Sequence, residues 1–348
     1  MPSELICEVV QIGKFGKHPN ADTLSITHVY DFPVIFKTGD FKEGDSAIYF
    51  PVDAMLPVRP EFAFIWQDKE NPTERQRSIK AKKLRGIFSM GLFMPTKLFG
   101  LDHCEFGVNV AEILGVVKTP DPVEGCNMSG NNRGSPNWFS HYTDIESARK
   151  YSSVFVVGEE VIVTEKIHGA NARFAFCKTD EFPEGDLWVG SHRLAKANDD
   201  NNEWSRFARE NNLKDKLSAY PDYLFFGEIY GKTQAGNGYD YGNPRASKVA
   251  FFDIFDIKTG RYLDYDTAFI IFTNLGLETA PVLYRGPWTS FENMESMADG
   301  LTILGKGSHN REGFVLRPIT ERWDERLGRT IIKLHGQAFL LNDKAQKV

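Results

Sequence analysis

The sequence predicts an α+β protein of two domains, a β-rich N-terminal domain followed by a larger domain of strands and helices. Three observations support this prediction. The chain has 348 residues, too many for one ordinary core. Short apolar runs separated by Gly, Asn, Asp and Pro continue to about Gly115, and a segment rich in Pro and Gly follows. We therefore expect domains at 1–116 and 138–348, joined by a linker at 117–137.

Charge and cysteine content limit the classes of function. The formal net charge is −6, so any nucleic-acid site must be a local patch. The four cysteines form no CxxC pair, which argues against zinc and for reduced thiols inside a cell. The sequence shows no signal-peptide pattern and no apolar run near the ~20 residues of a membrane span. We expect a soluble, cytoplasmic protein without a membrane partner, or a nuclear or mitochondrial one in cells with those compartments.

The N-terminal domain is expected to be a small barrel or sandwich. Its strands are predicted from the apolar runs Leu5–Ile12, Ser25–Val29, Val34–Phe36 and Ala47–Phe50. Three aromatic residues follow, Phe62, Phe64 and Trp66, which either stack on bases or belong to the core. Both interpretations remain open.

A basic run follows the aromatic residues. It consists of Arg75, Arg77, Lys80, Lys82, Lys83 and Arg85, with no acidic residue among them. Such a run is usually a solvated loop. In an acidic protein, however, it is a local anomaly, and phosphate contacts dominate nucleic-acid affinity. We therefore predict that this run contacts nucleic acid.

The second domain is organised around Val161–Phe176, which reads as two strands joined by a tight turn. We expect Gly169 to supply the turn through a positive φ. Lys166 lies just before the turn, where a lysine is unusual unless its amine does chemistry. A lysine with a lowered pKa is a nucleophile. An isolated K-x-x-G is more often a surface lysine beside a turn, so the interpretation depends on the motifs that follow.

Two helical stretches are also expected. Asp144–Lys150 precedes the strand pair, with Thr143 as its N-cap, and the region between Asn198 and Tyr220 has a helical pattern.

Six motifs follow one another, each in a strand-like context. They are Glu165–Gly169 (EKIHG), Gly190–Arg193 (GSHR), Phe226–Gly231 (FGEIYG), Phe251–Asp256 (FFDIFD), Glu312–Arg317 (EGFVLR) and Ile332–His335 (IKLH). This ordered set resembles that of the covalent nucleotidyltransferases, and its KxHG form resembles the ATP-dependent RNA ligases. The resemblance extends from about Phe139 to about Phe339. It implies a ligase-type domain of antiparallel sheets flanked by helices.

The N-terminal domain carries a second resemblance. His18–Ser25 (HPNADTLS) is similar to the signature of tRNA-binding OB modules, and Leu84–Leu92 to a later strand of the same module. The resemblance implies an OB-type β-barrel. DNA ligases and capping enzymes carry their OB domain after the last lysine motif, whereas here it comes first. That order resembles the RNA ligases that seal nicks in duplexes with an RNA 3′-hydroxyl.

The resemblance implies a reaction in three steps and a role for each lysine. The Lys166 amine attacks the α-phosphate of ATP, AMP passes to an RNA 5′-phosphate, and a 3′-hydroxyl then displaces AMP. ATP and Mg²⁺ or Mn²⁺ are the expected cofactors. Lys333 is expected to contact the α-phosphate and to help lower the pKa of Lys166. The family's next lysine is replaced here by His335, which is only partly charged at neutral pH.

The remaining roles also come from the resemblance. Glu312 is expected to act in catalysis and, with Glu228, to hold the metal ion, while Glu228 also contacts the nucleotide. Arg193 is expected to bind the ribose or the incoming RNA end. The other expected nucleotide contacts are Phe252, which stacks on adenine, and Glu165 and Ile167 beside the lysine.

The leading hypothesis is therefore a monomeric ATP-dependent RNA ligase acting on nicked RNA-containing duplexes. One alternative is another covalent nucleotidyltransferase, a DNA ligase or an mRNA guanylyltransferase, which uses the same lysine chemistry. The other is a non-catalytic OB-fold RNA-binding protein, which would form no covalent AMP adduct.

Overall fold

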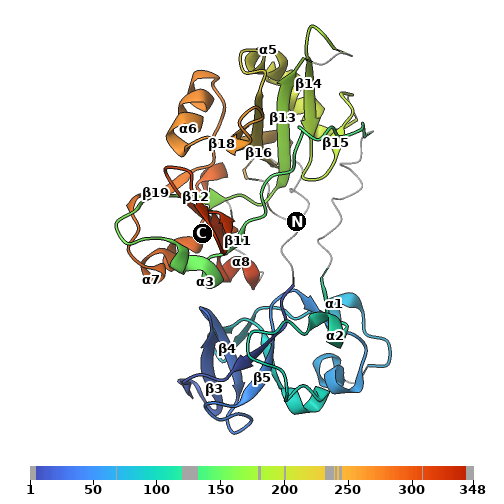
Figure 1. Ribbon diagram of the computed structural model, residues 1–348, viewed down its shortest axis with the longest axis vertical. Helices are drawn as coiled ribbons and strands as arrows, with labels where there is room; N and C mark the ends of the chain where they lie inside the picture. The colour runs from blue at the N-terminus through green and yellow to red at the C-terminus, as the bar shows by residue number, and fades with distance from the viewer. Residues whose placement is uncertain are drawn as a thin grey trace. The chain divides into compact units, whose positions relative to one another are not determined.

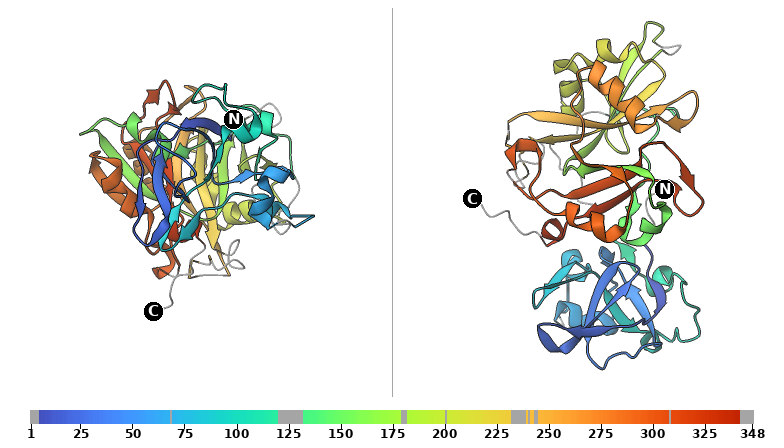
Figure 2. Two further views of the ribbon diagram at one scale, coloured as in Figure 1. Left: turned by 90° about the horizontal axis from the view of Figure 1, so that it is seen from below. Right: turned by 90° about the vertical axis from the view of Figure 1, so that its left-hand side faces the viewer.

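The computed structural model divides the chain into two compact units, Met1–Asp121 and Pro122–Val348. Figure 1 shows the first unit in blue to teal and the second in green to red, and Figure 2 gives two further views. The residues that the structure describes are 5–67, 69–119, 132–178, 182–199, 201–231, 239, 241–242, 245–307 and 309–341.

Two three-stranded antiparallel sheets form the centre of the first unit, in the orders β1-β5-β9 and β2-β3-β4. Their strands are β1 (Glu8–Gln11), β2 (Gly16–His18), β3 (Ala21–Val29), β4 (Phe32–Lys37), β5 (Ser46–Phe50) and β9 (Leu92–Pro95). Strand β5 is buried on both faces, because Ile48 and Phe50 pack in one apolar cluster and Ala47 and Tyr49 in another. Among the described residues, the ladders form separate sheets rather than one closed barrel.

Shorter elements complete the first unit. They are β6 (Ala54–Met55), η1 (Pro60–Trp66), α1 (Glu74–Arg77), β7 (Lys82–Leu84), β8 (Ile87–Ser89), η2 (Thr96–Phe99), α2 (Ala111–Leu114) and β10 (Val117–Lys118). The aromatic residues of η1 divide, because Phe62 and Trp66 are buried in the core whereas Phe64 is 58% exposed. Of the three, only Phe64 is therefore available for stacking.

The segment expected to link the domains is only partly described. Strand β10 pairs with β6, so 117–118, expected at the start of the linker, form a strand of the first unit. Residues 120–131 of the expected linker lie outside the described residues. Cys7, Cys104 and Cys177 are unpaired, and Cys126 also lies outside the described residues.

Two sheets form the framework of the second unit. The five-stranded sheet has the order β11-β23-β20-β12-β19, and the six-stranded sheet the order β15-β14-β13-β16-β17-β18. The first contains β11 (Glu146–Ser147), β12 (Glu160–Lys166), β19 (Val282–Pro287), β20 (Gly313–Pro318) and β23 (Ile332–His335). The second contains β13 (Ala170–Cys177), β14 (Asp186–Gly190), β15 (Ala195–Lys196), β16 (Tyr223–Gly231), β17 (Ser247–Asp256) and β18 (Arg261–Tyr262). A small hairpin pairs β21 (Trp323–Asp324) with β22 (Gly328–Arg329).

The helices of the second unit lie on the outer faces of the two sheets. Side chains of α4 (Glu203–Glu210), α5 (Leu213–Leu217) and α6 (Tyr265–Asn274) pack on the six-stranded sheet. Figure 1 labels α5 and α6 in the same unit as strands β13, β14 and β16 of this sheet. Those of α3 (Ala148–Tyr151) and α7 (Phe291–Glu295) pack on the five-stranded sheet. The other helical segments are η4 (Ser152–Val154), η6 (Ser296–Ala298), η7 (Leu304–Lys306) and α8 (Gln337–Leu340). The inner faces of the sheets meet, since Phe226 of β16 shares a cluster with Val315 of β20.

Two expectations about local structure are wrong. The strands β12 and β13 exist, but they do not form a hairpin, because β12 pairs with β19 and β20 whereas β13 pairs with β14 and β16. The helix expected at Asp144–Lys150 begins only at Ala148. Glu146 and Ser147 instead pair with β23, and the N-cap is Ser147 rather than Thr143.

Candidate active site

Strand register brings the lysine motifs together on the inner face of the five-stranded sheet. Lys166 is paired with Gly313, and Gly313 with His335, so the first and last motifs share one row. Lys333 is paired with Val315 in the row two residues along, and alternate residues of a strand face the same side. The side chains of Lys166, Lys333 and His335 therefore share one face.

Glu312, immediately before β20, is the centre of this group. The Nζ atom of Lys166 donates a hydrogen bond to Oε1 of Glu312 at 2.6 Å. The Nε2 atom of His335 lies 3.3 Å from the same oxygen, and Nδ1 of His168 lies 3.7 Å from Oε2. Burial alone would raise the pKa of Glu312, but the Lys166 ammonium and the contacts with His168 and His335 hold the pKa well below its usual range. Glu312 is therefore ionised at neutral pH.

The same contacts determine the ionisation of Lys166. Burial lowers the pKa of the amine, but the charges of Glu312 and Glu228 and the hydrogen bond to Glu312 outweigh burial and raise it. The protein's own side chains therefore raise the pKa of Lys166, and the expectation that Lys333 lowers it is wrong. Burial lowers the pKa of His335, and Lys166 and Lys333 oppose the effect of Glu312 on it, so His335 is neutral at pH 7.

Gly169 lets the six-stranded sheet approach the lysine. A Cβ atom on Gly169 would lie 2.3 Å from the carbonyl oxygen of Ile229 and 2.8 Å from Cγ of Glu228. Its φ is not in the left-handed region, so the expected reason for this glycine is wrong. The glycine is needed because β16 passes so close to the chain between β12 and β13.

Asn171 is a candidate site residue that the sequence did not point to. It is paired with Glu228 across β13 and β16, and its Oδ1 atom is buried without a hydrogen-bond partner among the described residues. A buried acceptor left unpaired costs free energy, so such an atom is a candidate contact for a ligand. The signal available in the sequence was a carboxamide five residues after the lysine, on the strand that follows the turn.

The expected nucleotide contacts occupy different environments. Glu165 faces the opposite side of β12, is 2% exposed, and accepts hydrogen bonds from the hydroxyl of Thr302 and, at 2.8 Å, from the backbone N–H of Ile303. Ile167 is buried in a cluster with Tyr230 and Tyr241.

Phe252 and Arg193 differ in exposure. Phe252 is the extra residue of a β-bulge, since Phe226 pairs with Asp253 and Gly227 with Phe251. Its half-buried ring lies on the inner face of the sheet, 5.0 Å from the ring of Tyr142. Arg193 is exposed and follows β14. Among the described residues, no hydrogen bond or ion pair joins it to Lys166 or Glu312.

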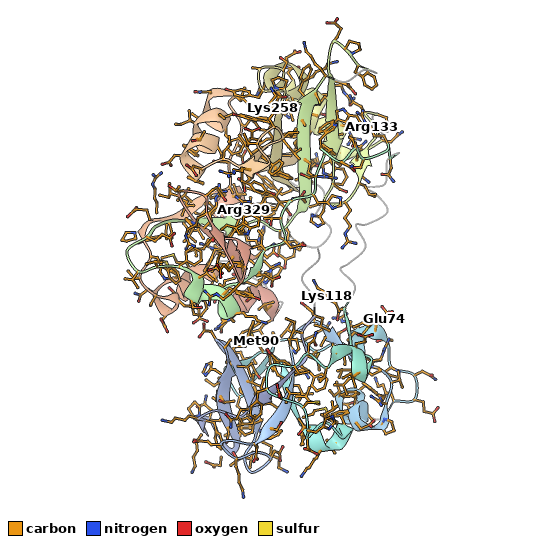
Figure 3. The ribbon with its side chains drawn as sticks, viewed as in Figure 1. Glu74, Met90, Lys118, Arg133, Lys258 and Arg329 are labelled. Carbon is orange, nitrogen blue, oxygen red and sulfur yellow. The ribbon has the colours of Figure 1, made fainter. Side chains whose placement is uncertain are left out.

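The bulge also positions a buried ionic cluster that the sequence reasoning did not predict. Asp253 is fully buried and accepts hydrogen bonds from Arg317 at 2.8 Å and Tyr142 at 2.7 Å. Nη2 of Arg329 (Figure 3) lies 2.7 Å from Oδ2 of Asp253, the oxygen that also accepts from Tyr142. Burial would raise the pKa of Asp253, but the two arginines lower it below its ordinary value. The cluster joins the two sheets of the second unit.

The residues expected to contact nucleic acid differ in their exposure to solvent. Arg75, Lys80, Lys82, Lys83 and Arg85 are exposed. Arg77 is half-buried and donates a hydrogen bond to the carbonyl of Leu56 at 2.9 Å.

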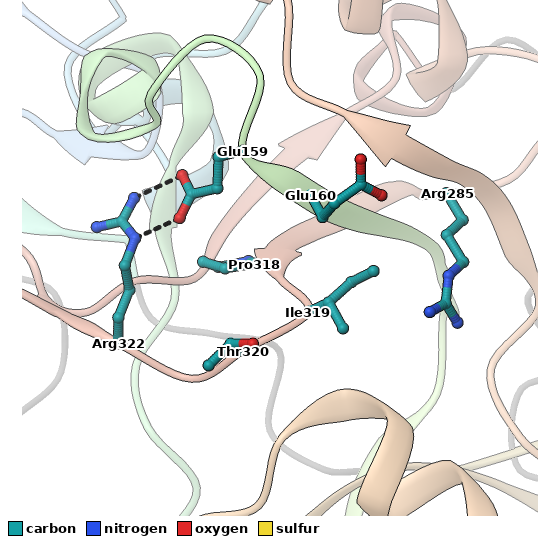
Figure 4. A pocket seen from close by; sticks show the side chains of 7 residues that line it. All are labelled: Glu159, Glu160, Arg285, Pro318, Ile319, Thr320 and Arg322. Atoms are coloured by element: carbon teal, nitrogen blue, oxygen red, sulfur yellow. Dashed lines mark hydrogen bonds and ion pairs between the residues drawn. The ribbon is translucent and has the colours of Figure 1, made fainter.

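A cleft of about 420 Å³ lies at the other end of β12, lined by Glu159, Glu160, Arg285, Pro318, Ile319, Thr320 and Arg322 (Figure 4). Glu160 begins the strand that Lys166 ends, so the cleft is roughly 20 Å from the lysine at 3.3 Å per residue. Its charged groups are largely paired, Glu159 with Arg322 and Arg285 with Asp266. The cleft is thus separate from the lysine cluster.

Both units of the chain resemble known protein families. A family model described as RNA ligase matches residues 159–335, and a model described as an OB-fold domain matches 6–96. No curated protein matches the chain. No helix in the described part of the chain is long and apolar enough to cross a membrane.

Structures of the RNA ligase of Naegleria gruberi share the fold at 24% sequence identity. The complex with PPi has a TM-score of 0.80 and covers 97% of this chain and 98% of that chain. An apo mutant has a TM-score of 0.82 and covers 99% of both chains. A mutant with AMP and Mn has a TM-score of 0.81 and covers 97% of this chain and 98% of that chain.

These matches confirm the predicted fold class, an OB-fold followed by a ligase-type domain with antiparallel sheets and flanking helices. The RNA ligase model covers more than half of the 348 residues and includes the lysine, both acidic motifs and the last strand. The chain belongs to the RNA ligase family.

Proposed function

We propose that this chain is an ATP-dependent RNA ligase that seals nicks with a 3′-hydroxyl and a 5′-phosphate in duplexes whose 3′-hydroxyl strand is RNA. The reaction would proceed through a lysyl-AMP and an adenylylated RNA (AppRNA) intermediate. The observation that carries the proposal is the 2.6 Å contact between Lys166 Nζ and Glu312 Oε1, with Lys333 and His335 on the same sheet face. The family match supports the reaction class.

Lys166 is the proposed nucleophile. Its nitrogen forms the new N–P bond to the α-phosphate of ATP, the bond to the β-phosphate breaks, and pyrophosphate leaves with the electron pair. The ammonium must first lose a proton, and the charge of Glu312 and its hydrogen bond to Lys166 oppose that loss. Binding of a cation by the Glu312 carboxylate would weaken its interaction with the Lys166 ammonium. The pKa of the amine would then fall, and the amine would become nucleophilic.

The proposed metal ligands are Glu312 and Glu228, because ionised carboxylate oxygens suit Mg²⁺ or Mn²⁺. Among the described residues, no group of three His, Cys, Asp or Glu side chains is arranged to hold a metal alone. Phosphate oxygens and water would complete the coordination, as is usual for Mg²⁺. The cation would supply neutralisation of phosphate charge. The Naegleria ligase structures with ATP and Mn support this choice of cofactors.

We propose the other roles from position. Lys333 contacts the α-phosphate, and Asn171 and Arg193 contact substrate from the six-stranded sheet. Phe252 packs against adenine, while Ile167 and Glu165 shape the base-binding side. The first unit supplies a nucleic-acid surface, and the enzyme works as a monomer in the cytoplasm.

The test is incubation with radiolabelled ATP and Mg²⁺ or Mn²⁺, followed by denaturing electrophoresis. We expect label on the wild type and on Lys258→Ala, a matched control that removes a lysine 72% exposed in the same unit. We expect none on Lys166→Ala. Label retained by Lys166→Ala would remove the assignment of the nucleophile.

The same preparation distinguishes the related functions. Labelling by GTP in place of ATP would indicate a capping enzyme, and sealing of all-DNA nicks as fast as nicks with an RNA 3′-hydroxyl would indicate a DNA ligase. RNA binding without any protein–AMP adduct would indicate a non-catalytic binding protein.

A further inference from the structure

We propose that the β7–β8 hairpin of the first unit is the element that contacts the nucleic-acid backbone, and that His18 and Asn20 are positioning residues that hold it. The inference rests on the proposed function, because it takes nicked duplex as the partner. It goes beyond that function by separating residues that bind from residues that orient them.

The two segments are 66 positions apart in the chain and meet through side chain–backbone hydrogen bonds. Nε2 of His18 lies 3.0 Å from the carbonyl oxygen of Leu84. Nδ1 of His18 lies 3.0 Å from the backbone N–H of Asn20, and the amide of Asn20 donates to the carbonyl of Arg85 at 3.0 Å. A backbone N–H can only donate and a carbonyl can only accept, so the partners assign His18 as the neutral tautomer with its proton on Nε2. His18 is 4% exposed, so neither bond is replaced readily by water.

The turn of this hairpin is energetically unusual. Leu84 and Ile87 are paired, which leaves Arg85 and Gly86 as a two-residue turn with φ of 46° and 89°. Positive φ at both positions is the type I′ turn, whose first position favours Asn, Asp or Gly. Arginine is not favoured by the backbone conformation at this position. We therefore attribute its presence to its guanidinium group. The Asn20 bond to the Arg85 carbonyl holds the strained residue in place.

The hairpin carries a cluster of positively charged side chains. Lys82 and Lys83 lie on β7 and face opposite sides of the strand, and Arg85 is at the tip. All three are exposed, and none takes part in an ion pair among the described residues. By contrast, Arg77 is bound to the Leu56 carbonyl and belongs to the scaffold. An unpaired positive cluster in a chain of net charge −6 matches a polyanion, and in an RNA ligase the polyanion is nucleic acid.

Arg85→Asn separates binding from structure most sharply. Asparagine suits the first position of the turn, so the melting temperature should stay equal to that of the wild type or rise. Affinity for a nicked RNA duplex should fall several-fold, and the slope of log affinity against log salt should decrease by about 0.9 for one lost phosphate contact. Lys42→Ala, an exposed lysine elsewhere in the first unit, is the matched control and should bind as the wild type does.

Asn20→Ala tests the positioning role, because it changes no charge. We expect the KM for nicked duplex to rise about 3- to 10-fold at unchanged kcat, with labelling of Lys166 by ATP alone unaffected. His18→Gln keeps an N–H that can reach the Leu84 carbonyl, so it should impair binding less than His18→Ala. In a second arm of the experiment, binding of the wild type and of the same variants to vesicles of anionic phosphatidylserine is measured.

Wild-type nick affinity in both Arg85→Asn and Asn20→Ala would overturn the inference. So would a loss of vesicle binding with nick binding unchanged. These results are distinguishable from failure of the proposed function, which would appear as absence of ATP labelling in the wild type.

Discussion

At the residue scale, one oxygen of Glu312 is shared by Lys166 and by His335, the histidine that stands where the resemblance implies a second lysine. Lys166 and His335 both contact Oε1 of Glu312, at 2.6 Å and 3.3 Å. Because His335 is neutral at pH 7, the cluster has one fewer positive charge near Lys166 than a second lysine would give. The amine is correspondingly held in its ammonium form.

This predicts the effect of restoring the lysine. In His335→Lys, an added ammonium beside Lys166 should lower the pKa of the Lys166 amine, so the alkaline rise of the labelling rate should move about one pH unit lower. The measurement is the rate of protein–AMP formation against pH. The control is His335→Gln, which adds no charge and should leave the midpoint near that of the wild type. An unchanged midpoint in His335→Lys would contradict the explanation.

At the element scale, the separation of β12 and β13 into different sheets matters most. Period-2 patterns predicted both strands correctly. Such a pattern does not determine which strands pair, and the short turn between β12 and β13 suggested a hairpin. The structure places Lys166 at the end of β12, where the chain leaves one sheet for the other. The close approach at Gly169 makes that crossing possible.

Gly169→Ala should therefore damage both fold and activity. The new Cβ would overlap the Ile229 carbonyl, and overpacking of this kind costs about 1–3 kcal/mol. We expect the free energy of unfolding to fall by about that amount and labelling by ATP to drop at least tenfold. Chemical denaturation and the labelling assay measure the two effects. Gly134→Ala is the control, because no atom lies within 4 Å of its added Cβ. Equal behaviour of the two variants would refute the steric explanation.

The ionic cluster at Asp253 belongs to the same scale. Asp253→Asn leaves Arg317 and Arg329 buried without their full counter-charge, which typically costs about 3–5 kcal/mol. Asp266→Asn removes a carboxylate from an exposed pair with Arg285 and should cost at most about 1 kcal/mol.

The cluster also predicts a pH dependence of stability. The pKa of Asp253 is lower in the folded than in the unfolded chain, so its contribution is complete above about pH 3.8 and is lost as the pH falls further. Denaturation curves at several acidic pH values should show a shallower loss of stability in Asp253→Asn than in the wild type. Parallel curves would mean that Asp253 does not carry this dependence.

At the scale of the whole molecule, labelling and sealing should differ in their response to salt. Under the proposed function, nucleotide transfer to Lys166 would require only the second unit, whereas nick binding would also use phosphate contacts that release counterions. Replacing Lys80, Lys82 and Lys83 together by Ala should weaken nick binding and flatten its salt dependence, with labelling intact. Binding titrations at several salt concentrations measure the slope. A slope equal to that of the wild type would exclude the basic run as the phosphate-binding element.

The sequence predicted much of this molecule because motif order and strand periodicity are local properties. The order from Lys166 to Lys333, the strands around it and the N-terminal all-β module could all be predicted. Contacts between distant segments could not be predicted, such as His18 with Leu84 or Asp253 with Arg329. They depend on packing between sheets and loops, which no local pattern encodes. The raised pKa of Lys166 was missed for the same reason, since it depends on the distance to Glu312.

The position of Lys166 at the crossing between two sheets has a mechanical consequence. A nucleotide covalently attached there would contact both sheets at once, β20 and β23 on one side and β16 on the other. It would thereby reduce the local opening of both sheets. Deuterium uptake measured before and after adenylylation should therefore slow in β16 and β20 together rather than in β12 alone. The lysyl-AMP adduct would then stabilise the contact between the two sheets as well as activate the AMP for transfer.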